Sequence, residues 1–448
     1  MNPIRPSLAR KRYPLRYWIF VVFAVGVPGF MQFDGSGRTH ELGLFNPSSL
    51  SNIALTLSCA FMFASVCVLS RRRLLLRRID FCMWLWIALL ILFLIASVLQ
   101  PNNNSGAPSA SDLPLSLYRL GEWVLGFVML LSLYTSEGED RAIDLVVRLI
   151  GTVVWTYIAI VWTALPIIPS LVYASPEDIG DGRARLGGVL IHPVHLSVLA
   201  GVAFFHSLLF FQGRKRIFCC GITVLTLLMA YSRSEQIVFL VALFAYLMIF
   251  SRKFILRMFG ATAICTVVAA GIVFQEKVLD YLERGQGMRN VTTLSERTDV
   301  WDASFKAFWL RPYIGYGFIA GVKHAIKDHW NATNWVPPQS HNEFIQALVS
   351  GGILAGLLML AIYVRVLWVA FRNARRSIKH TFLLIVVLQL SIMAIIMPLV
   401  TVQFSRIGVI FLLSFVGLVA DAKAPAKVRQ TRMAQVPSIP PLQWPSEV

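Results

Sequence analysis

Charged residues are scarce in this 448-residue sequence, making up 14% of it, whereas hydrophobic residues make up 56% and the mean hydropathy is +0.66. A water-soluble domain usually carries about 25% charged residues. The shortage of charge therefore excludes an ordinary soluble globular protein. It indicates instead that a large part of the chain faces lipid.

Acidic residues are few even among the charged ones, with 23 Asp and Glu against 41 Lys and Arg and a formal net charge of +18. Such an excess on one continuous stripe would indicate nucleic-acid binding. The basic residues instead form short clusters between apolar runs, near 10–16, 71–78, 214–216, 252–257, 372–379 and 423–432. Clusters of this kind are typical of the cytoplasmic loops of membrane proteins. The acidic segment 135–143 is an exception that carries little weight in this rule.

Cysteine is also sparse, and no two cysteines form a CxxC pair. This excludes a zinc-finger pattern and gives no sign of a disulfide framework. We interpret the cysteines as small apolar packing residues in helices. They are Cys59, Cys67, Cys82, Cys219, Cys220 and Cys265.

Long apolar runs are what the sequence does have. A bilayer core needs about 20 apolar residues per helix, so the runs predict an all-α polytopic membrane protein with about twelve transmembrane helices. The expected spans are 17–33, 49–69, 81–100, 114–134, 145–167, 189–211, 217–232, 236–250, 254–274, 344–364, 381–399 and 404–420. The polar segment 232–236 predicts a tight turn between the seventh and eighth spans, because isolated charges at bilayer depth are costly.

The basic clusters predict the topology. We expect a cytoplasmic N-terminal segment at 1–16, nine spans within 17–274, a large helical periplasmic loop at 275–343, three spans within 344–420 and a disordered cytoplasmic tail at 421–448. Both termini are then cytoplasmic. We expect the first span to stay uncleaved, because no small-residue cleavage site follows Phe33.

The loop 275–343 is too long for a plain connection. Thr293-x-x-Glu296 has the pattern of a capping box and predicts the start of an amphipathic helix. This helix would lie on the membrane surface or over the bundle, and Pro312 ends it. The apolar residues at helical spacing are Leu294, Trp301, Phe305 and Phe308.

A second capping box, Ser340-x-x-Glu343, stands directly before the tenth span and predicts Ser340 as the N-cap and His341 as the first helical residue. The positive helix end would attract phosphate. It would also disfavour imidazolium, so His341 would stay neutral and could serve as a general base. The alternatives are that Glu343 is only a cap and that His341 is a helix-start residue at the level of the headgroups.

Several motifs together resemble the O-antigen ligase and polymerase superfamily. The segment from Ser340-His341-Asn342-Glu343 to Gly351-Gly352-Ile353 resembles that family's His-Asn helix start. Arg297 with Trp301, Arg311-Pro312 with Gly315-Tyr316-Gly317, Ser232-Arg233-Ser234 and Arg185-Leu186-Gly187-Gly188 with Pro193 are similar to its other segments. Val194 and His195 depart from the family pattern, which often has Asn after this proline.

The resemblance implies a glycosyltransferase of the bacterial inner membrane with a periplasmic active site. Its donor would be a glycan on undecaprenyl diphosphate, and its acceptor a hydroxyl of lipid A-core or of a growing glycan. His341 matches the family's base, and Arg233, Arg297 and Arg185 are candidates for binding the diphosphate. The supporting candidates are Glu343, Asn342 and Arg311. The large loop has no Asp-x-Asp motif, so we expect the arginines to act in place of a metal, with no cofactor.

Three acceptor classes stay open, because a ligase, a polymerase of repeat units and a protein O-glycosyltransferase share the donor chemistry. A transporter of lipid-linked sugars is disfavoured, because no internal repeat is present and the notable polar residues lie in loops. Whether Arg183 or Arg185 faces the site also stays open. Metal binding by His192 and His195, at i and i+3, is a minor alternative. We expect the remaining arginines on this side to meet lipid headgroups; they are Arg284, Arg289 and Arg406.

Overall fold

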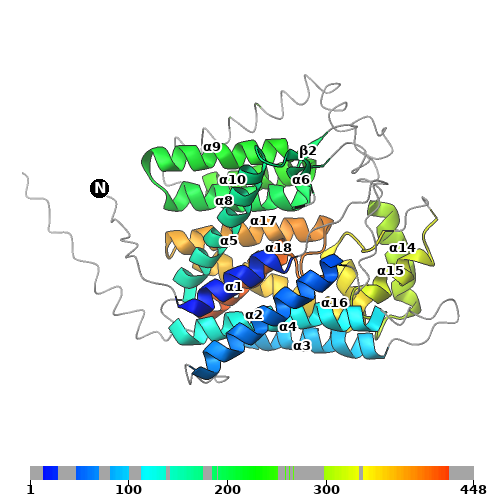
Figure 1. Ribbon diagram of the computed structural model, residues 1–448. Helices are drawn as coiled ribbons and strands as arrows, with labels where there is room; N and C mark the ends of the chain where they lie inside the picture. The colour runs from blue at the N-terminus through cyan, green and yellow to red at the C-terminus, as the bar shows by residue number, and fades with distance from the viewer. Residues whose placement is uncertain are drawn as a thin grey trace, which may run out of the picture.

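The computed structural model describes residues 14–28, 47–69, 81–99, 112–137, 142–174, 184–188, 190–250, 297–331 and 337–422, with the isolated residues 258, 262 and 266. In these segments the regular structure is almost entirely α-helical, as predicted. The short hairpin of β1 (Tyr173–Ala174) and β2 (Arg185–Leu186) was not predicted. The long helices form a bundle, and two helices of the large loop, α14 and α15, sit at one end of it (Figure 1).

The bundle helices follow the expected spans closely. Their bounds are α1 (Leu15–Gly26), α2 (Pro47–Leu69), α3 (Phe81–Val98), α4 (Asp112–Glu137), α5 (Ala142–Ala164), α8 (Pro193–Phe210), α9 (Gly213–Met229), α10 (Arg233–Phe250), α16 (Glu343–Asn373), α17 (Ile378–Ile396) and α18 (Arg406–Ala422). The remaining elements are α6 (Pro169–Val172), α14 (Arg297–Leu310) and α15 (Ala320–Lys327). The ninth expected span, 254–274, lies almost wholly outside the described residues, so the number twelve stays a prediction.

Seven of the described helices are long and apolar enough to cross a membrane, namely α2, α3, α4, α5, α8, α16 and α17. The outer surface of the bundle is apolar as well: Phe61 and Val68 on α2 are 75% and 76% exposed. Water would not favour such side chains on a surface of this extent. The fold is therefore consistent with a polytopic membrane protein.

The core of the bundle is organised around α18. The described side chains from Arg406 to Val419 are buried, and an all-round buried helix must pack on every side. It packs against α5, α16 and α17. The ring of Phe411 stacks on Tyr363 of α16, with the ring centroids 4.5 Å apart. This places the first residue of α18, Arg406, inside the bundle rather than at its rim.

The polar segment between α9 and α10 is a tight turn, as predicted. Met229 ends α9 and Arg233 begins α10. Tyr231 in the turn takes a left-handed conformation with φ of 52°, and the N–H of Gln236 donates to the carbonyl of Ser232 at 3.0 Å. The reversal places Arg233 at the first residue of α10.

The amphipathic helix predicted in the large loop is α14, and its proposed capping box at 293–296 lies outside the described residues. Its buried face is formed by Val300, Ala303, Ala307 and Phe308. Phe305, which the pattern placed on the apolar face, is 41% exposed and is not part of the buried packing of α14. The two alanines allow close packing on that face, and Phe305 lies off it.

A kink in α16 receives the segment that links α14 to α15. Gly351 and Gly352 leave the helical conformation, with φ of −133° and 74°. The freed backbone groups pair with this segment: Tyr316 N–H donates to Val349 at 2.8 Å, and Ile353 N–H donates to the carbonyl of Pro312 at 2.7 Å. The large loop is thereby docked on the span that follows His341.

We predict that Gly352→Ala destabilises the protein by about 1–3 kcal/mol, because alanine is strained at positive φ and its Cβ would overlap the carbonyl of Tyr313. Thermal unfolding of the detergent-solubilised protein measures this. The control is Gly221→Ala in α9, where a Cβ meets nothing within 4 Å. Equal melting temperatures for the Gly352 variant and the wild type would contradict the docking of the loop on this kink.

Candidate active site

His341 lies directly before α16 and is not part of the helix. Its φ of 50° is left-handed, and α16 begins at Glu343. The N-cap is Asn342, whose Oδ1 accepts a hydrogen bond from the N–H of Phe344 at 2.9 Å. The prediction that Ser340 is the N-cap and His341 the first helical residue was therefore wrong. Asparagine is at least as good an N-cap as serine, and it starts this helix two residues later.

Ser340 has a different role from the one predicted. Its N–H donates to Gln346 Oε1 at 2.8 Å, and its hydroxyl accepts a hydrogen bond from the hydroxyl of Ser304 at 3.1 Å. Both hydroxyl-bearing residues are fully buried. Ser340 thus fixes the backbone just before His341 to both α14 and α16.

Glu343 holds the loop between α17 and α18, residues 397–405, called here the α17–α18 loop. Its carboxylate accepts hydrogen bonds from three consecutive backbone N–H groups, those of Leu399, Val400 and Thr401, the last at 3.0 Å. Its side chain is fully buried. Glu343 is therefore neither a cap of its own helix nor an exposed acid, and it ties the start of α16 to another part of the bundle.

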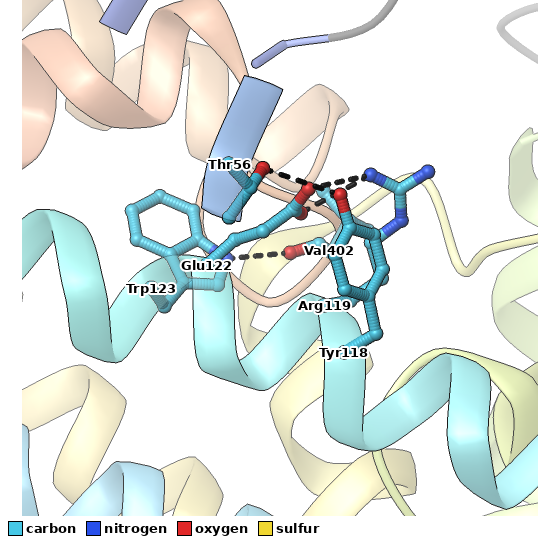
Figure 2. A network of polar contacts seen from close by, with 6 residues as sticks. All are labelled: Thr56, Tyr118, Arg119, Glu122, Trp123 and Val402. Carbon is cyan, nitrogen blue, oxygen red and sulfur yellow. Dashed lines mark hydrogen bonds and ion pairs between the residues drawn. The ribbon is translucent and has the colours of Figure 1, made fainter. Parts of the chain in front are cut away.

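The other side of the α17–α18 loop is held by α4. Trp123 Nε1 donates to the carbonyl of Val402 at 2.8 Å, beside an ion pair of Arg119 and Glu122 at 3.0 Å (Figure 2). Both charged residues are buried, with exposures of 4% and 0%. Sequence reasoning had placed the notable polar residues in loops and missed this pair. A buried charge is tolerable inside a span when its partner lies next to it.

His341 is held in its neutral form. Burial lowers the pKa of its imidazole to about 4, and the charge of Arg297 and the ring of His192 act in the same direction. The sequence predicted neutrality from the helix end alone. In the structure the larger cause is removal from water, which disfavours the charged ring. A neutral imidazole at physiological pH can accept a proton.

One predicted arginine, Arg297, acts electrostatically on this histidine, and the other, Arg233, acts on Arg297. Arg297 is the first residue of α14, and Arg233 is the first residue of α10. Burial lowers the pKa of the Arg297 guanidinium, Glu235 opposes this, and Arg233 adds to it. The fully buried Glu235, which sequence reasoning had not singled out as a site residue, lies two residues after Arg233 in α10. Arg233, Arg297 and His341 thus come together from three separate segments.

The other candidates have different places. Arg185 is buried in β2 opposite Ala174, and a role beside the diphosphate stays a prediction for it. Arg183 lies outside the described residues. Arg311 lies over the ring of Tyr316, 4.7 Å from its centroid, and the Tyr316 hydroxyl donates to Ala307 at 3.0 Å. This places Arg311 within the packing of the large loop.

Sequence reasoning gave two basic residues, Arg406 and His192, roles other than phosphate binding. Arg406 was expected to meet lipid headgroups, but it is only 4% exposed and donates from Nη2 to the carbonyl of Leu190 at 2.8 Å. Arg284 and Arg289, in the same expectation, lie outside the described residues. His192 is the N-cap of α8. Burial and the charge of Arg406 lower its pKa to about 4.

These basic residues share one feature, a place at the start of a helix. Three are the first residues of α10, α14 and α18, His192 lies immediately before α8, and His341 lies two residues before α16. Electrostatic influence on pKa links them in the order Arg233, Arg297, His341, His192 and Arg406. We call these five residues the basic cluster. A helix start already carries partial positive charge, so basic residues are normally found at the opposite end. This reversal was visible in the sequence at the predicted helix starts.

Comparison with known families identifies the central part of the chain. Residues 218–360 match the family model for O-antigen ligase. The match supports an O-antigen ligase-like superfamily and confirms the resemblance drawn from the motifs. No curated protein matches the chain. The O-antigen ligase segment includes Arg233, Arg297 and His341, whereas His192 and Arg406 lie outside it.

We predict that Glu343→Ala lowers the free energy of unfolding by about 2–4 kcal/mol, because three buried backbone N–H groups lose their acceptor. Glu343→Gln, which keeps one acceptor oxygen, should lose less. Thermal unfolding of the purified protein gives the order of the three forms. An alanine variant as stable as the wild type would show that Glu343 does not hold the α17–α18 loop.

Proposed function

We propose that this protein is a glycosyltransferase of the O-antigen ligase type, which moves a glycan from undecaprenyl diphosphate to an acceptor hydroxyl of lipid A-core on the periplasmic side of the inner membrane. The observation that carries the proposal is a half-buried, neutral histidine within electrostatic reach of a half-buried arginine, which itself lies near a second arginine. At family level, the O-antigen ligase match supports a ligase or polymerase of lipid-linked glycans.

His341 supplies the base in this scheme. The acceptor hydroxyl forms a bond to the anomeric carbon, and its proton passes to the neutral imidazole. The bond from that carbon to the diphosphate oxygen breaks, and its electron pair leaves with the diphosphate. Direct displacement of this kind inverts the anomeric centre. The hydrogen bonds on either side of His341 keep its backbone fixed, so that little reorganisation is needed when the proton moves.

Arg297 and Arg233 bind the departing diphosphate in this scheme. A guanidinium can donate two parallel hydrogen bonds to phosphate oxygens and keeps its charge at all physiological pH values. Negative charge grows on the leaving oxygen as the bond breaks, so cations fixed at that place stabilise the transition state more than the bound substrate. Glu235 lies close enough to Arg297 to raise the pKa of its guanidinium, which favours a fixed, charged side chain.

The identity of the acceptor is tested by deletion of the protein in the bacterium and analysis of the glycans that accumulate. If the protein is a ligase, its deletion removes lipid A-linked glycan while a lipid-linked polymer accumulates. Accumulation of single lipid-linked repeat units would contradict the ligase assignment and favour a polymerase with the same donor chemistry. Unchanged lipid-linked intermediates together with glycan trapped on the cytoplasmic side would favour a transporter instead.

We predict that His341→Gln lowers kcat for glycan transfer by about 10²–10⁴-fold, because glutamine cannot take the acceptor proton. A reconstituted assay with a lipid-linked donor measures the rate. The matched control is His324→Gln, an exposed histidine on α15 of the same loop, which should leave kcat within about twofold of the wild type. Full activity of the His341 variant would remove the base from this mechanism.

The pH profile should show the depressed pKa of His341. A lowered pKa keeps the imidazole in its proton-accepting form as the pH falls, so kcat/KM should stay level from about pH 8 down to about pH 5. It should then fall by about tenfold per pH unit below the pKa of about 4 of the free enzyme. An acidic limb near the ordinary histidine value of about 6.5 would contradict the buried, neutral state.

A further inference from the structure

Arg406 is held rigidly inside the bundle, at the end of the α17–α18 loop. Its Nη2 donates to the carbonyl of Leu190 at 2.8 Å, and its guanidinium carbon lies 5.3 Å from the ring centroid of Tyr157. The hydroxyl of Ser405 accepts from the N–H of Gly408 at 2.9 Å and so caps the first turn of α18. Arg406 therefore has a fixed position and carries its charge at very low exposure.

The α17–α18 loop connects this arginine to His341. Glu343, two residues after His341, binds three N–H groups of the loop, and Ser405 donates back to Leu399 at 2.7 Å. The histidine and Arg406 thus lie on two segments that one carboxylate joins. A fixed relation between two groups is what a site for one ligand needs.

His192 follows Leu190, whose carbonyl Arg406 binds, by two residues, and its ring can act as a hydrogen-bond donor. Its Nδ1 accepts from the N–H of Val194 at 3.3 Å, so in the neutral ring the proton is on Nε2. Burial and Arg406 keep the ring neutral, with a pKa of about 4. His195 meets it edge to face, with 5.8 Å between ring centroids. The buried Nδ1 of His195 has no hydrogen-bond partner in the described part of the chain, and such an atom favours a ligand beside it.

A metal ion would be one occupant of two adjacent histidines, but a nearby cation does not favour it. Arg406 influences His192 electrostatically, and no group of three metal-ligating residues occurs among the described residues. A fixed positive charge beside an N–H donor instead suits a phosphate oxygen. The positive starts of α8 and α18 add to the same preference.

We propose that His192 and Arg406 form a second phosphate-binding arm of the active site, which takes one phosphate of the donor's diphosphate while Arg233 and Arg297 take the other. This inference rests on the proposed function and adds residues outside the O-antigen ligase segment to its site. His341 lies between the two arms in the order of electrostatic influence. The leaving diphosphate would then be bound from two sides, with the base next to both.

The test is binding of inorganic pyrophosphate to the purified full-length protein in nanodiscs, measured by calorimetry. His192→Asn is the informative variant, because asparagine can still cap α8 but lacks the Nε2 donor. Arg406→Lys keeps the charge but loses the planar fork. We expect each variant to bind pyrophosphate about tenfold more weakly than the wild type, with an unchanged melting temperature for His192→Asn.

The matched controls are His324→Asn and Arg148→Lys, which change the same residue types on α15 and in α5, away from the basic cluster. They should bind pyrophosphate with the affinity of the wild type. Unchanged affinity in both His192→Asn and Arg406→Lys would overturn the second arm. So would a loss of the same size in the two controls.

Two further comparisons separate the sources of phosphate and the two proposals. If the variants bind pyrophosphate normally but associate less with phosphatidic acid in the nanodisc, the arm binds a phospholipid headgroup and the assignment to the donor is wrong. Pyrophosphate binding needs no turnover, so His341→Gln should retain it. Loss of transfer in that variant with normal pyrophosphate affinity in the two arm variants would leave the proposed function standing and remove only the second arm.

Discussion

Positive charge is unfavourable at the beginning of a helix, and this protein places an arginine at the first residue of three of its described helices, α10, α14 and α18, and a neutral histidine just before two more. The starts of α8, α10, α14, α16 and α18 carry the basic cluster, with Glu235 as the carboxylate that acts on Arg297. Helix ends and side chains then add to one positive field in a region shielded from water. Such an arrangement costs stability in the absence of an anion. A diphosphate that enters it relieves the repulsion, which gives a physical reason for the site to bind this group.

The start of α16 joins the chemistry to the fold. Three consecutive residues have three roles: His341 is the proposed base, Asn342 caps the helix, and Glu343 binds the α17–α18 loop. Asn342 also donates from Nδ2 to the carbonyl of Ile395 at the end of α17, at 2.9 Å. The start of α16 is thereby tied both to the end of α17 and to the α17–α18 loop that leads to Arg406. A change in α4 that displaces the α17–α18 loop, for example at Trp123, would therefore affect both His341 and Arg406.

Much of the architecture could be predicted because apolar length and turn polarity are local signals. The runs of about 20 apolar residues located the described spans, and the cluster at 232–236 located the turn between α9 and α10. Which of two neighbouring residues caps a helix is harder to predict. Ser340 and Asn342 are both good caps, and tertiary bonds hold each in its place, Asn342 to Ile395 and Ser340 to Ser304. The same applies to Glu343, whose partners lie more than fifty residues away in sequence.

The basic cluster also contains residues that the sequence motifs predicted and residues that they did not. Arg233, Arg297 and His341 could be grouped from motifs on one side of the membrane, and the structure brings them together. Arg406 and the ion pair of Arg119 and Glu122 were missed, because burial of a charge depends on how helices pack and not on the run in which the residue stands. A basic residue at a predicted helix start was the available signal. It contradicts the usual charge preference of helices, and such contradictions tend to mark functional sites.

The central claim is that His341 is a neutral proton acceptor whose state is set by burial and by Arg297. It is tested most directly by NMR titration of the protein with ¹⁵N-labelled histidine, with His341→Gln used to assign the signal. The account predicts that His341 titrates with a pKa of about 4. It also predicts that the pKa rises in Arg297→Gln and on addition of pyrophosphate, because each change removes or neutralises positive charge nearby. A His341 pKa at or above about 6.5, or one that does not respond to either change, would contradict the account.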